Sequence, residues 1–263
     1  MKLLKRTIDE LTIDDERSFR HVGIYDDLKR ALRDDGFCFR VPEKKGTPDA
    51  TWDRVLFLNL TFWSAAEPSD ILPDDHVAAD VVAHAAWHHL ARRALPGPVT
   101  SDALFLGESI ASAFDLYLVG RLVGHAPNSE FLETQVPAMA EATAVAGLSE
   151  EGFEALLQRI AADPDRAFED LRELLFDAAT TLFRCEGADE AAAALERFAG
   201  HPYAALLHHY ELSNWILYAR AYAQPGQGPV EDDRVRTIDS ALRAANVALD
   251  WLHEHWIAAG PRL

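Results

Sequence analysis

One segment, residues 74–95, constrains the fold of this chain more than any other. Its sequence, DDHVAADVVAHAAWHHLARRAL, places four polar side chains at successive four-residue steps: His76, Asp80, His84 and His88. Side chains that recur at this interval share one face of an α-helix, and His84 and His88 stack one turn apart. The segment therefore predicts a helix over 74–95 with histidines along one face.

A second helical pattern follows at residues 101–122 and carries Glu108 within an apolar run. Only a short Pro-Gly-Pro connection separates the two helices, so we expect an antiparallel hairpin that returns Glu108 toward the histidines. Two imidazoles and one carboxylate can hold a metal and leave positions open for water or substrate. We therefore predict a metal site formed by His84, His88 and Glu108.

The same residues carry a family resemblance. VVAHAAWHHL resembles the metal-binding helix of the gluzincin metallopeptidases, which contain H-E-x-x-H and take a glutamate from a later helix as third ligand. In the thermolysin-like members this glutamate lies twenty residues after the second histidine, which is the separation of Glu108 from His88. The resemblance covers residues 77–118 and implies zinc ligation by His84, His88 and Glu108, and a hydrolase-like activity.

The chain departs from the gluzincin pattern at two positions. Ala85 stands where H-E-x-x-H has its glutamate, the general base that acts on the metal-bound water. Alanine cannot accept a proton, so we expect no ordinary peptidase activity. The family's acid four residues after the third ligand is replaced by Ser112, and Asp115 follows about one turn later.

If the protein is catalytic, another side chain must transfer the proton. A second polar cluster, HHYELSNWILY at residues 208–218, places His208 and Glu211 on one side of a predicted helix. We predict that Glu211, His208 or Asp115 supplies the proton transfer, and that His208 or Glu211 approaches the metal site from the opposite wall. A helix with a polar surface stripe is the alternative interpretation.

Two other functions fit the same residues. Two histidines and one carboxylate are also the ligand set of mononuclear non-haem iron(II) oxygenases, so iron is the alternative metal. A metal-free helical binding or interaction module is the third hypothesis, in which the histidine helix is only amphipathic. The sequence contains no G-x-S-x-G, Walker or G-x-G-x-x-G motif, which leaves serine hydrolases, nucleotide triphosphatases and Rossmann oxidoreductases unsupported.

Helical periodicity dominates the rest of the chain. Further helices are predicted at residues 25–36, 130–146 with an interruption at Pro137, 150–162, 164–183, 189–198, 202–222 and 232–256. Strand signals are few: residues 37–41 suggest a lone strand, and 51–63 fit either a buried strand or, as we favour, a helix. We predict an all-α or nearly all-α single domain over 1–263, with one or two short strands near the N-terminus and an irregular arm at 1–24.

The net charge limits which partners are expected, and the cysteine content indicates the cellular compartment. With 43 acidic and 25 basic residues the formal net charge is −18, which disfavours nucleic acid and anionic membranes. No segment is expected to span a membrane, because none reaches about 18 consecutive apolar residues. The two cysteines do not indicate a disulfide framework, so a cytoplasmic location is expected. The ligand is expected to be a small molecule or a peptide.

Overall fold

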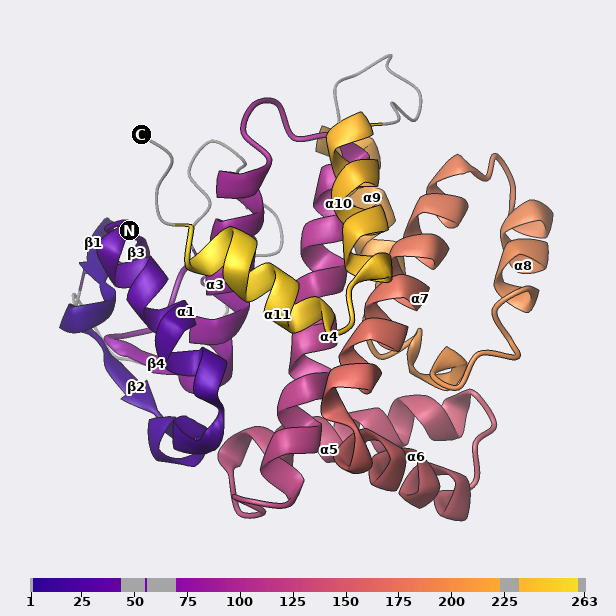
Figure 1. Ribbon diagram of the computed structural model, residues 1–263, viewed down its shortest axis with the longest axis horizontal. Coiled ribbons are helices and arrows are strands. Elements are labelled where there is room, and N and C mark those ends of the chain that lie inside the picture. Colours follow the sequence, from indigo (N-terminus) through magenta and orange to yellow (C-terminus); the bar gives the residue numbers. More distant parts are fainter. Residues whose placement is uncertain (1, 44–54, 56–69, 223–231, 260–263) are drawn as a thin grey trace.

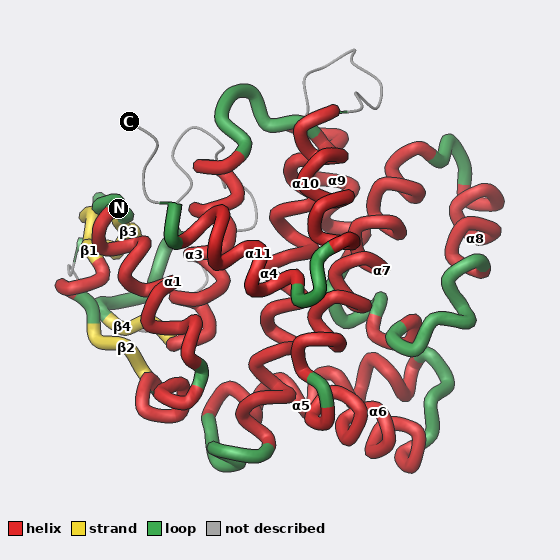
Figure 2. Tube along the Cα trace, in the orientation of Figure 1, coloured by secondary structure: helices red, strands yellow, loops and turns green. Residues whose placement is uncertain are grey.

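The computed structural model describes residues 2–43, 55, 70–222 and 232–259. Within these residues the chain is mostly helical, with two short two-stranded sheets gathered at one edge (Figure 2). The predicted nearly all-α fold is thereby confirmed. The region predicted as helix or strand at 51–63 lies outside the described residues, apart from Val55.

Helix α4 (Ser101–Val123) is the central element of the fold. It is apolar on all sides, as expected of a helix surrounded by protein, and Figure 1 shows α3 and α7 on either side of it. By length and composition alone, α4 is also the one helix among the described residues that could cross a membrane, which we did not expect from the sequence. However, 78% of its most apolar 18-residue stretch is buried inside the protein. The Thr100 hydroxyl starts the helix by accepting a hydrogen bond from the Ala103 amide, 3.1 Å away.

Helix α3 (Ala79–Ala94) forms the predicted hairpin with α4. It begins later than predicted, because residues His76–Ala78 form strand β4, which pairs in parallel with β2 (Thr12–Asp14). The His76 ring is mostly exposed and lies 2.9 Å from Asp14. The prediction that His76 shares the helix face of His84 and His88 is therefore wrong, and the cause is a pairing between distant segments.

The first residues are structured, not the irregular arm that we expected. Strand β1 (Leu3–Thr7) pairs antiparallel with β3 (Cys38–Pro42), so the strand predicted at 37–41 is real but has a partner. Phe19 is buried in the core just before α1 (Gly23–Asp34). These elements cover the outer side of α3, on the left in Figure 1, and so help to hold it against α4.

The predicted middle helices are found nearly as expected: α5 (Glu130–Val145), α6 (Glu150–Ala162), α7 (Pro164–Arg184) and α8 (Ala188–Glu196). Two of them begin behind a side chain that accepts a hydrogen bond from a first-turn amide: Ser149 accepts from Gly152 at α6, and Asp163 accepts from Arg166 at α7. Helix α5 continues through Pro137, contrary to the predicted interruption. Pro137 is exposed, so water can reach the carbonyl group that lacks its backbone partner.

The last two predicted helices are each broken. Residues 202–211 contain only a short 3-10 turn, Ala204–Leu206, before α9 (Leu212–Tyr222), because Glu211 has a left-handed backbone with φ 50°. The C-terminal region divides into α10 (Asp233–Ala244), α11 (Ala248–Leu252) and a π-helical turn, His253–Ile257. The prediction of single helices over 202–222 and 232–256 is therefore wrong.

Candidate metal centre

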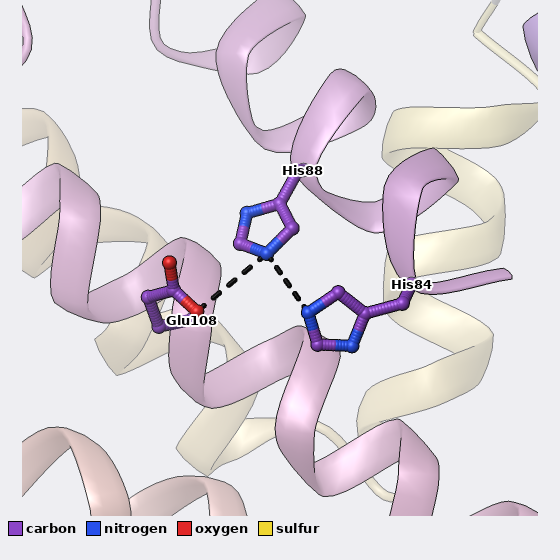
Figure 3. A group of neighbouring side chains, drawn as sticks. All are labelled: His84, His88 and Glu108. Atoms are coloured by element: carbon purple, nitrogen blue, oxygen red, sulfur yellow. Dashed lines mark hydrogen bonds and ion pairs between the residues drawn. The ribbon is translucent and has the colours of Figure 1, made fainter. Parts of the chain in front are cut away.

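The three predicted ligands converge between α3 and α4. Figure 3 shows the rings of His84 and His88 pointing toward each other from α3 while the Glu108 carboxylate approaches from α4. One ligand atom from each residue lies within 4.8 Å of the other two. The two histidine Nε2 atoms are 3.1 Å apart, and His88 Nε2 lies 3.6 Å from a Glu108 oxygen.

These distances fit the spacing that a metal requires. Ligands about 2.0–2.1 Å from a tetrahedral zinc lie about 3.4 Å from one another. The His84–His88 and His88–Glu108 distances, 3.1 and 3.6 Å, lie on either side of that value. Only the third edge of the triangle, at up to 4.8 Å, needs to shorten.

Asp115 orients the first ligand. Asp115 lies about two helical turns after Glu108 on α4. Its carboxylate oxygen lies 3.2 Å from His84 Nδ1. Because a carboxylate only accepts hydrogen bonds, Nδ1 carries the proton and donates it to Asp115. His84 Nε2 is thereby directed toward the cluster. Histidine ligands in proteins are commonly oriented by an outer carboxylate in this way.

Charges in the cluster are strongly coupled. Burial lowers the pKa of His84, but the hydrogen bond to Asp115 and the charges of Asp115, Glu108 and Asp70 together raise this pKa to about 9. Burial, assisted by the neighbouring His84 cation, lowers the pKa of His88 to about 3. The charged His84 therefore donates its Nε2 proton to the neutral His88 Nε2. A bound metal would take the place of this shared proton.

Other carboxyl groups surround the histidine pair. Burial raises the pKa of Glu108 to about 7, and His84 opposes this rise. Burial and the Asp115 charge raise the pKa of Asp80 to about 6, and burial also raises the pKa of Asp70. Several acids are thus crowded around one imidazolium in a poorly hydrated place. A divalent cation would relieve this repulsion.

Two cavities lie near this region, and they differ in their relation to the ligands. A small cavity of about 80 Å³ between α3 and α4 is lined by both His88 and Glu108. A larger cavity of about 1300 Å³, among α6, α7, α8 and α9, contains none of the three ligands in its lining. The small cavity is therefore the one that adjoins the metal centre.

The predicted proton-transfer residues are distributed differently from our expectation. Asp115 lies at the site, in contact with His84. The exposed His208 and Glu211 line the larger cavity and do not form the opposite wall of the cluster. Burial lowers the pKa of the neighbouring His209 and raises that of Tyr210, and the Asp115 charge acts on both groups. Residues 202–211 do not form a regular helix, so helical spacing could not predict where these side chains lie.

No family model, curated protein or solved structure matches this chain in the three comparisons.

Proposed function

We propose that this protein is a metalloprotein that binds one divalent metal ion, zinc, through His84, His88 and Glu108. The observation that carries the proposal is the convergence of three ligand atoms within 4.8 Å of one another. The orientation of His84 by Asp115 supports it, because this contact selects the ring nitrogen that faces the cluster. Neither feature is needed to pack an apolar helical hairpin.

The proposed site resembles that of a gluzincin without its base. Zinc held by three protein ligands lowers the pKa of a bound water to about 7 and polarises carbonyl groups. Ala85, at the position of the family's glutamate, is only 4% exposed and offers no proton acceptor. We assign Asp115 a positioning role, since its oxygen is engaged with His84. The proposed activity is that of a divergent metal-dependent hydrolase acting on a small substrate.

Peptidase activity is expected to be undetectable on unfolded protein substrates, even with zinc bound. General base catalysis contributes about 10²–10⁴ in rate, and Ala85 cannot provide it. The measurement is release of fluorescent fragments from a labelled, unfolded casein-type substrate with and without chelator. Robust chelator-sensitive cleavage would show that another residue has taken over the role of the base.

The identity of the metal is the second part of the proposal. Two histidines and one carboxylate also form the ligand set of iron(II) oxygenases, so iron is the alternative to zinc. A metal-free helical interaction module is the remaining alternative. Metal analysis separates all three.

The test is metal content after purification, and again after stripping with chelator and reloading with zinc or anaerobic iron(II). Mass spectrometry of the elements should give close to one metal per wild-type chain, with zinc preferred. His84→Ala and His88→Ala should lower the occupancy at least tenfold. His125→Ala is a matched control, because the His125 ring is exposed and contacts the Arg121 carbonyl of its own helix region.

Background metal in the wild type, with no uptake of either ion, would exclude the metalloprotein and favour the interaction module. Equal occupancy in the wild type and in both ligand variants would show that metal binds elsewhere.

A further inference from the structure

The small cavity beside His88 and Glu108 has the features of a ligand pocket. It lies where α3 and α4 approach their connecting loop, and Tyr218 of α9 forms part of its wall. Apart from the two metal ligands, the polar side chains in its lining are Arg92 and Tyr218. The remaining walls are aliphatic or glycine, among them Ala91, Leu95 and Leu104.

The size of the cavity limits what it can hold. An engineered protein cavity of about 150 Å³ binds benzene, which has six carbons. The pocket has about 80 Å³, so by proportion it holds about three carbon atoms. A short aliphatic chain fits this space, and an aromatic ring does not.

We propose that the metal site binds short-chain aliphatic acyl compounds. The acyl oxygen binds the metal beside His88 and Glu108, and a chain of about three carbons fills the adjoining pocket. This inference rests on the proposed metalloprotein function and adds the substrate class to it. It follows from the position of two metal ligands in the wall of a small, mainly aliphatic cavity.

Gly107 offers a way to change the pocket without replacing a proposed metal ligand. A Cβ atom added at Gly107 would lie 3.5 Å from Ala91 Cβ and 3.8 Å from His88 Nδ1, both ordinary contact distances. Gly107→Ala therefore places a methyl group among the pocket walls without a clash. Gly124→Ala, near the end of the same helix, is the matched control because its Cβ would meet nothing within 4 Å.

The probes are three hydroxamates, which bind zinc strongly through two oxygens and differ in their carbon chain. Acetohydroxamate has one carbon beyond the carbonyl, butanohydroxamate has three, and benzohydroxamate has a phenyl ring. Dissociation constants are measured by calorimetry on zinc-loaded full-length protein. Each buried methylene tightens binding by about fourfold, so butanohydroxamate should bind roughly tenfold or more tightly than acetohydroxamate. Benzohydroxamate should bind less tightly than butanohydroxamate.

The variants test whether this preference comes from the pocket. Gly107→Ala should reduce the advantage of the three-carbon chain by about fourfold, because one methyl group occupies part of the space. Leu104→Ala should enlarge the pocket and tighten benzohydroxamate binding relative to butanohydroxamate. Gly124→Ala should behave as the wild type. Circular dichroism and zinc content verify that each variant is folded and loaded.

The outcomes separate the two claims. Full zinc occupancy with no dependence of affinity on chain length, or with no effect of Gly107→Ala, overturns the pocket while the metal site stands. Zinc at background in wild-type protein overturns the proposed function and this inference with it.

Discussion

Asp115 determines which nitrogen of His84 faces the other ligands. Its carboxylate lies 3.2 Å from Nδ1, so the geometry depends on a charge-assisted hydrogen bond. We expect Asp115→Asn to weaken zinc binding about 10- to 100-fold, the usual cost of losing an outer partner of a ligand. A competition titration against a zinc-binding dye measures this. The exposed Asp189→Asn is the control, and equal affinities for Asp115→Asn and wild type would contradict the assigned role.

The pH dependence of metal binding follows from the protonation of the ligands. Burial lowers the pKa of His84, but the nearby carboxylates raise it to about 9, so His84 must lose its Nε2 proton to bind metal. Glu108, whose pKa burial raises to about 7, must also be ionised, whereas burial keeps His88 neutral with a pKa of about 3. Zinc affinity should therefore rise about tenfold per pH unit from pH 7 to 9, and more steeply below pH 7. Affinity that stays constant from pH 6 to 9 would show that these groups are not the ligands.

The clustering of the three candidate ligands was predictable from the sequence, and their partners were only partly so. His84, His88 and Glu108 follow from helical spacing and a short loop, because both are local properties. Asp115 was recognised as a nearby acid, but not as the partner of His84 Nδ1, since ring orientation depends on packing. The positions of His208 and Glu211 could not be predicted from helical spacing, because residues 202–211 contain only a short 3-10 turn.

At the scale of elements, close packing of α4 against the α6–α7 corner holds the hairpin in place. A Cβ at Gly120 would lie 2.7 Å from the Ile160 carbonyl oxygen and 3.0 Å from Pro164. Gly120→Ala should therefore lower the free energy of unfolding by about 1–2 kcal/mol, despite the better helix propensity of alanine. Urea denaturation measures the change. Gly124→Ala should stay within about 0.5 kcal/mol of the wild type, and a neutral Gly120→Ala would contradict the close approach.

The sequence predicts best the helices whose first residues carry a start signal, such as a capping side chain or a proline. Helix α6 begins after the Ser149 cap as predicted, and α7 begins at Pro164 behind the Asp163 cap. Strand β4 was missed because its partner, β2, lies about sixty residues earlier, and pairing between distant segments overrides helical spacing. The break before α9 was missed because it depends on the backbone of Glu211, a residue type that rarely adopts positive φ.

For the whole molecule, charge affects how a metal experiment must be designed. The net charge of −18 attracts cations, so weak binding to surface carboxylates is expected at high metal concentration. The number of metal ions bound per chain is therefore weaker evidence for the proposed site than the identity of the atoms that bind the metal. The same field would favour capture of a divalent cation by the proposed site between α3 and α4.

X-ray absorption spectroscopy at the zinc edge, on protein loaded with one equivalent, tests the central claim most directly. The proposed site predicts two imidazole nitrogens together with carboxylate and water oxygens at about 2.0–2.1 Å, with no sulfur. The imidazole signature should disappear in a variant carrying both His84→Ala and His88→Ala. A shell of oxygens alone would place the zinc on surface carboxylates, and a sulfur at about 2.3 Å would place it on Cys38 or Cys185. Either result would contradict a metal centre formed by His84, His88 and Glu108.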